Sequence, residues 1–113
     1  MSAGIEECSG EKDGNCECGD SSQGFQTYTF MQDNVQRCFT VFHPLDRAGE
    51  SLPVVFSPQC YGKDKLMSIS MKNVNAADNK AAARYGFARI GVSTPDGHWT
   101  FGLVFILDHV III

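Results

Sequence analysis

The sequence predicts an α/β fold in which a leading antiparallel hairpin precedes a parallel βαβ unit. Three observations predict it: two strand-like runs separated by a tight turn, a short continuous apolar run, and an alanine-rich helical segment followed by another strand-like run. With 113 residues, the chain suffices for one small domain. Its content of 43% hydrophobic and 11% aromatic residues is typical of a globular protein.

The predicted hairpin consists of residues 25–32 and 35–43, which are rich in aromatic, threonine and valine residues. Between them, Asp33 and Asn34 suit a tight two-residue turn, because both residue types tolerate a positive φ. Pro44 ends the second run, since proline has no backbone N–H to donate to a ladder.

The predicted βαβ unit starts with residues 52–56, a continuous apolar run that is typical of a strand buried on both faces of a parallel sheet. Residues 75–85 predict a helix because alanine favours one, and Gly86 stands where a left-handed C-terminal cap belongs. Residues 87–93 then return as a strand, so the two strands are expected to pair in parallel. The expected inward stripe of the helix comprises Val74, Ala77, Ala81 and Tyr85.

Residues 1–24 are expected to form an acidic leader or loop, because they are rich in glycine, serine and cysteine and have no apolar period. Lys12 is their only base, against six acidic residues. The whole chain carries a net charge of -4 and no basic stripe, which excludes nucleic acid as a partner. The acidic residues of this segment are Glu6, Glu7, Glu11, Asp13, Glu17 and Asp20.

The chain has five cysteines, so at least one thiol is free, bonded to another chain or missing its partner. This density favours a secretory compartment, but residues 1–24 contain no apolar run resembling a signal peptide, which leaves the compartment open. Cys16 and Cys18 have one residue between them, not the two of zinc or thioredoxin-like sites. A structural disulfide or plain exposure is therefore favoured over a metal or redox site. The five are Cys8, Cys16, Cys18, Cys38 and Cys60.

Four segments, in this order and spacing, resemble a known family: residues 41–44 (Val-Phe-His-Pro), 52–56 (Leu-Pro-Val-Val-Phe), 81–87 (Ala-Ala-Ala-Arg-Tyr-Gly-Phe) and 99–102 (Trp-Thr-Phe-Gly). The chain resembles the secreted α/β-hydrolase esterases grouped with polyhydroxybutyrate depolymerases and feruloyl esterases. The resemblance implies a partial, truncated α/β-hydrolase sheet, with residues 25–102 as the N-terminal part of the domain and an extracellular location. It also implies a serine carboxylic ester hydrolase that acts on polysaccharide-linked or polymeric esters and needs no cofactor.

The resemblance also implies site residues. In such hydrolases the loop after the third strand supplies a backbone N–H to the oxyanion hole. Residues 59–62 (Gln-Cys-Tyr-Gly) fall where the family carries His-Gly-x-Gly and match its last residue, so Cys60 and Tyr61 are the oxyanion-hole candidates. His98 and Trp99 are candidates for the substrate cleft. The alternatives for this pair are a loop histidine satisfied by its neighbours and a tryptophan that covers the sheet edge.

No catalytic residue is identified, because the chain contains no G-x-S-x-G nucleophile elbow. Residues 91–95 (Gly-Val-Ser-Thr-Pro) come nearest but end in proline, so Ser93 is not expected to be a nucleophile. The chain as given is therefore predicted to be inactive. Residues 103–113 form an apolar tail, too short for the roughly 20 residues of a membrane span. We expect this tail to arise from truncation or mis-splicing and not to belong to the native fold.

Two other expectations stand beside the esterase. The first is a small non-catalytic module that binds carbohydrate or an aromatic ligand through Tyr61, Trp99 and Phe101. The alanine-rich segment 76–83 breaks the strand rhythm that a β-sandwich module would show. The second is self-association, because a partial sheet exposes strand edges and an uncovered apolar face.

Overall fold

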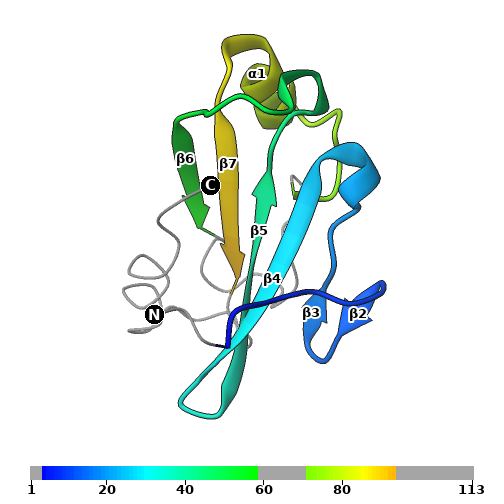
Figure 1. Cartoon of the computed structure of the whole chain (residues 1–113), viewed down its shortest axis with the longest axis vertical. Helices are drawn as coiled ribbons and strands as arrows, with labels where there is room; N and C mark the ends of the chain where they lie inside the picture. The colour runs from blue at the N-terminus through cyan, green and yellow to red at the C-terminus, as the bar shows by residue number, and fades with distance from the viewer. Residues whose placement is uncertain (1–3, 59–70, 94–113) are drawn as a thin grey trace.

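The structure is a computed structural model that describes residues 4–58 and 71–93 (Figure 1). These residues form a mixed α/β fold, as predicted, in which strands dominate and one α-helix is present. A five-stranded sheet has the order β1-β4-β5-β7-β6, and β2 and β3 form a separate small sheet. The strands are β1 Glu6–Glu7, β2 Lys12–Asp13, β3 Cys16–Glu17, β4 Phe25–Gln32, β5 Val35–Phe42, β6 Val54–Pro58 and β7 Ala88–Ser93; the helices are η1 Ser21–Gln23, η2 Leu45–Arg47 and α1 Ala77–Tyr85.

The predicted hairpin is confirmed by β4 and β5, which pair antiparallel from Phe25↔Phe42 to Gln32↔Val35. Asp33 and Asn34 join them with φ angles of 52° and 65°. Two consecutive positive φ values define a type I′ turn, whose twist matches that of the strands it connects. The turn residues therefore fix the register of the whole hairpin.

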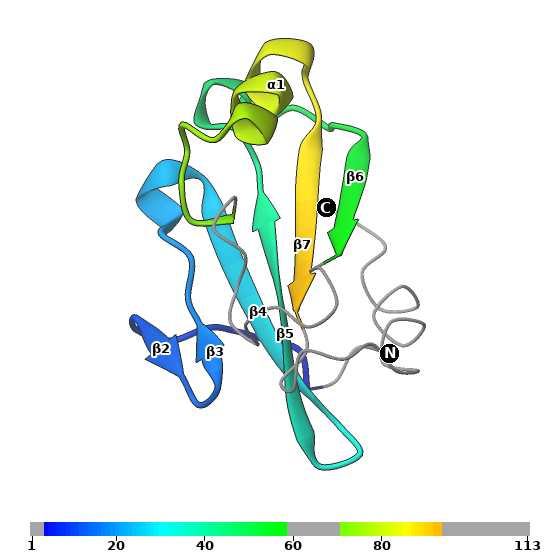
Figure 2. The same cartoon turned by 180° about the vertical axis from the view of Figure 1, so that it is seen from behind.

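The predicted parallel pairing is also confirmed. β6 pairs in parallel with β7, from Val54↔Ala88 to Pro58↔Val92, and α1 precedes β7 in the chain. β7 also pairs antiparallel with β5, so it lies between β5 and β6 (Figure 2). The sheet is consequently mixed, with its parallel pair at one side.

The burial expected for the strand at residues 52–56 is wrong. β6 is an edge strand of the described sheet, and the side chains of Val54 and Val55 are 41% and 44% exposed. The physical reason is the strand order, because the later strand β7 lies between β5 and β6 and leaves β6 one described neighbour. A continuous apolar run does not by itself distinguish a central from an edge position.

Alternation along the strands gives the sheet two different faces. One face, here called the helix face, packs against α1 and the residues before it. The other, here called the apolar face, carries a cluster of large hydrophobic side chains with which Ile5, Tyr28 and Phe56 pack. The helix-face cluster comprises Phe25, Phe42, Met71 and Ala82, and the apolar-face cluster comprises Phe30, Phe39, Val41, Ile90 and Val92.

Helix α1 ends as predicted at Gly86, whose φ is 80° and whose N–H donates to the carbonyl oxygen of Ala82 at 2.9 Å. Its inward stripe differs from the expected one: the buried residues are Asn79 and Ala82, whereas Tyr85 is 69% exposed. Alanine gives a helix little hydrophobic contrast between its sides. The orientation of α1 is set by the polar contacts of Asn79, described below.

Arg47, from η2, closes the carboxyl end of α1. Its Nε and Nη2 atoms donate to the carbonyl oxygens of Ala83 at 3.1 Å and Arg84 at 3.2 Å. These carbonyls have no partner inside the helix, and a positive charge is favourable at the negative end of the helix dipole. Arg47 thus fixes α1 to the connection between β5 and β6.

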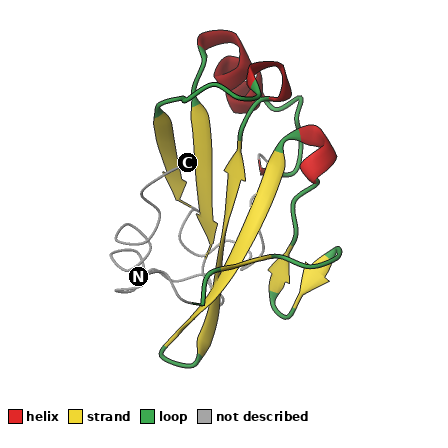
Figure 3. Cartoon of the chain, viewed as in Figure 1, coloured by secondary structure: helices red, strands yellow, loops and turns green. Residues whose placement is uncertain are grey.

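The N-terminal segment, residues 4–24, was expected to be a loop or leader but contains three two-residue strands (Figure 3). β1 adds to the sheet beside β4 through the pairs Glu6↔Thr29 and Glu7↔Tyr28. β2 and β3 form a small hairpin, and β3 contacts β5.

Candidate functional site

The carboxyl ends of β6 and β7 lie side by side, because Pro58, the last residue of β6, pairs with Val92 near the end of β7. The border of the sheet formed by these strand ends is here called the carboxyl edge. This edge is where open α/β sheets bind ligands, in the crevice outside the carboxyl ends of the strands. The oxyanion-hole candidates Cys60 and Tyr61 follow β6 in sequence, and the cleft candidates His98 and Trp99 follow β7. All four lie outside the described residues, as does the apolar tail.

Ser93 is placed by its backbone within β7. It pairs with Cys38 of β5 as the last residue of the ladder.

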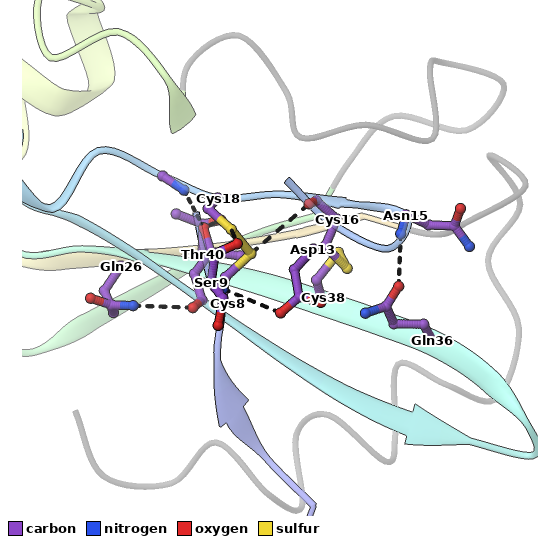
Figure 4. The surroundings of a disulfide bond; sticks show 12 residues. Cys8, Ser9, Asp13, Asn15, Cys16, Cys18, Gln26, Gln36, Cys38 and Thr40 are labelled. Carbon is purple, nitrogen blue, oxygen red and sulfur yellow. Dashed lines mark hydrogen bonds between the residues drawn. A yellow bond between two sulfur atoms is a disulfide. The ribbon is translucent and has the colours of Figure 1, made fainter. Parts of the chain in front are cut away.

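The described cysteines form two disulfides, Cys8–Cys18 and Cys16–Cys38 (Figure 4). Cys16 and Cys18 therefore bond to different partners, and the favoured expectation of structural disulfides is confirmed for both. Cys16 is 1% exposed and lies over Cys38 on the helix face. No sequence signal indicated the connectivity, because the spacing of cysteines alone does not determine it. Cys60 lies outside the described residues.

A surface hollow of about 410 Å³ lies beside these disulfides. Glu17 and Lys72 form an ion pair across it, which engages the Glu17 oxygen that has no hydrogen-bond partner. Within residues 4–58 and 71–93, no group of three histidine, cysteine, aspartate or glutamate side chains is arranged to hold a metal ion. The lining residues are Glu11, Lys12, Glu17, Cys18, Gly19, Asp20 and Lys72.

Arg89 of β7 is a buried cation that sequence reasoning missed. The residue is 3% exposed. Its Nη1 donates a hydrogen bond to Oδ1 of Asn79 at 2.6 Å, and its Nη2 lies 3.6 Å from Oδ2 of Asp78. Burial lowers the pKa of Arg89, and the carboxylate of Asp78 opposes this effect. The network ties the first turns of α1 to β7 and lies away from the carboxyl edge of the sheet.

His43, which belongs to one of the segments resembling the esterases, holds the connection after β5. Its Nδ1 lies 3.3 Å from the carbonyl oxygen of Pro44, and its Nε2 lies 3.1 Å from that of Glu50. Both ring nitrogens therefore face backbone of the same loop. This arrangement gives His43 a structural role in positioning η2.

No family model, curated protein or solved structure matches the chain. Among the described residues, no helix is long and apolar enough to cross a bilayer.

Proposed function

We propose that this chain forms the first strands of the sheet of a serine carboxylic ester hydrolase that acts on polysaccharide-linked or polymeric esters. The observation that carries the proposal is the strand order β4-β5-β7-β6. In α/β-hydrolase sheets the second strand runs antiparallel to the first, and the fourth lies between the second and the third. Counted from β4, this chain has the same order, with β5 antiparallel and β6 parallel to β7.

Numbering the strands from β4 gives the ends of β6 and β7 a proposed role in the active site. β6 is the third strand, so the residues after Pro58 would supply a backbone N–H to the oxyanion hole. We assign this role to Cys60 or Tyr61. A backbone donor aimed at the developing oxyanion stabilises an acyl-transfer transition state by about 3–4 kcal/mol. The residues after Ser93, including His98 and Trp99, would line the same cleft.

A nucleophile would have to come from an elbow that the 113 residues do not contain. The chain as given is therefore expected to hydrolyse neither methyl ferulate nor hydroxybutyrate oligomers above the buffer rate. It is expected to bind them weakly at the cleft. Trp99 is the only tryptophan, so its fluorescence reports binding at the proposed position.

The decisive experiment is to sequence the gene and its transcripts beyond the codon for Gly102. We expect a continuous frame that encodes G-x-S-x-G, and an extended protein that hydrolyses one of these esters. The variant with alanine at the elbow serine is the matched control and should lose that activity. If every transcript reads from Gly102 into the apolar tail and stops, the esterase proposal is wrong.

The binding-module alternative is less well supported, because α1 and the parallel pair are not features of a β-sandwich. Tyr61, Trp99 and Phe101 lie outside the described residues. Binding of a soluble polysaccharide that quenches Trp99, in an extended protein without ester hydrolysis, would favour the module.

A further inference from the structure

The N-terminal segment, residues 4–24, buries very little apolar surface. Cys16 is its only residue among the buried hydrophobic residues of the described chain, and Ile5 is half-buried. The segment also carries six acidic residues and one lysine, so its charges repel one another. Hydrophobic burial, the main driving force of folding, therefore contributes little to holding this segment on the sheet.

What holds the segment is one covalent bond and a few polar contacts. The Cys16–Cys38 disulfide joins it to β5. The N–H of Asn15 donates to Oε1 of Gln36 at 2.8 Å, and the N–H of Gly19 donates to Oγ1 of Thr27 at 2.8 Å. Further backbone hydrogen bonds run from Cys8 N to Thr27 O, from Phe25 N to Asp20 O and from His43 N to Gly24 O. The β1–β4 pairs and the Glu17–Lys72 ion pair add to them.

The two disulfides differ in location and access. Cys8–Cys18 lies wholly within the segment, and Cys18 lines the open hollow. Cys16–Cys38 links the segment to the sheet; Cys16 is 1% exposed, whereas Cys38 is half-buried, as are both Cys8 and Cys18, so only one end of this bond is open to attack. Because thiol–disulfide exchange requires access of a thiolate to a sulfur, the first bond is the easier one to reduce.

We propose that the two disulfides form a redox latch that a dithiol reductant opens in a fixed order. Cys8–Cys18 is reduced first and Cys16–Cys38 second, and the N-terminal segment then leaves the helix face while β4, β5, β6, β7 and α1 stay folded. The latch does not depend on the proposed esterase function. It would respond to the difference between an oxidising and a reducing compartment.

Each reduction is a two-electron exchange. A thiolate of the dithiol attacks one cysteine sulfur, the S–S bond breaks, and the other cysteine leaves as a thiolate that takes up a proton. The second thiol of the reductant then attacks the mixed disulfide. The reductant leaves as a cyclic disulfide, and the second cysteine is released as a thiol.

The order of opening can be measured on the full oxidised chain with increasing dithiothreitol, alkylation by iodoacetamide and peptide mass mapping. We expect Cys8 and Cys18 to be alkylated before Cys16 and Cys38, with Cys60 followed as a separate peptide. Simultaneous alkylation of all four, or alkylation of Cys16 and Cys38 first, would overturn the proposal.

The release of the segment is tested by hydrogen exchange on two matched variants. In Cys16→Ser/Cys38→Ser, amides of residues 5–19 should lose protection while those of β5 and β7 keep it. In Cys8→Ser/Cys18→Ser, the segment should stay protected through the remaining bond. A Cys16→Ser/Cys38→Ser protein that fails to fold, or whose segment stays protected, would contradict the latch.

Discussion

The helix face of the sheet is covered in two different ways along the length of β5. At the end that carries Phe42, α1 and Met71 cover the strands by close packing of apolar side chains. At Cys38, four residues earlier, the cover is the β2–β3 hairpin, which is held by a disulfide. Between them, the hydroxyls of Thr27 and Thr40 hydrogen-bond to each other at 2.7 Å.

This difference shows how an acidic segment with little apolar surface can cover part of the helix face. The helical cover brings apolar side chains and is stabilised by removing them from water. The hairpin contributes one buried cysteine, Cys16. Its stabilisation comes instead from the disulfide of this cysteine, which restricts the conformations of the unfolded chain. The two covers should therefore respond to different perturbations.

The largest effect is expected at the packed end. Phe42→Ala removes a side chain from a residue 1% exposed, and it should lower the free energy of unfolding by about 3–5 kcal/mol. Urea denaturation followed by circular dichroism measures this change. Leu45→Ala, at a residue 57% exposed, is the matched control and should change the free energy by less than about 0.5 kcal/mol.

The next effect is at the covalent end. Replacing Cys16 and Cys38 by alanine frees the unfolded chain over a separation of 22 residues and should lower the free energy of unfolding by about 3 kcal/mol. Replacing Cys8 and Cys18 should lower it by less, because that bond closes a loop with a separation of only 10 residues. Equal losses in both double variants would show that the segment unfolds together with the sheet.

A smaller effect tests the polar contact between α1 and the sheet. Arg89→Met keeps much of the side-chain volume but removes the donor to Asn79, so we expect a loss of about 1–3 kcal/mol. Arg84→Met, on the exposed side of the same helix, is the control. If Arg89→Met proves as stable as the original chain, the apolar packing of α1 alone holds it in place.

The smallest effect is expected on the apolar face. Burial raises the pKa of Tyr28 above its ordinary value, and the nearby Glu7 carboxylate adds to this. The fold therefore favours the neutral phenol. Its contribution to stability is fully present below about pH 10 and is lost as the pH rises further. Tyr28→Phe should therefore flatten the fall of the unfolding free energy as the pH rises above about 10.

The sequence was informative where local chemistry decides the structure. Asp33 and Asn34 set a turn that only residues tolerant of positive φ can form, and Gly86 capped its helix for the same reason. The parallel pairing of β6 with β7 followed from a strand, a helix and a strand in succession. The turn and the cap depended on a few adjacent residues, and the pairing depended on the order of elements along the chain.

The expectations that failed depended on contacts between distant residues. The edge position of β6 follows from the insertion of β7, and nothing in residues 52–56 indicates it. The inward side of α1 was misassigned because Asn79 reaches Arg89 across to the sheet. The partners of Cys8 and Cys16 were unpredictable, since several connectivities fit the same spacing. The candidate site residues Cys60, Tyr61, His98 and Trp99 stay predictions.

The contact of Arg47 with the carboxyl end of α1 has a consequence for the order of folding. A helix of nine residues is too short to persist alone in water, and this one receives its final hydrogen bonds from a residue 36 positions earlier in the chain. Helical signal should consequently grow in step with closure of the chain between residues 47 and 83, and a peptide of residues 71–86 alone should remain largely coil.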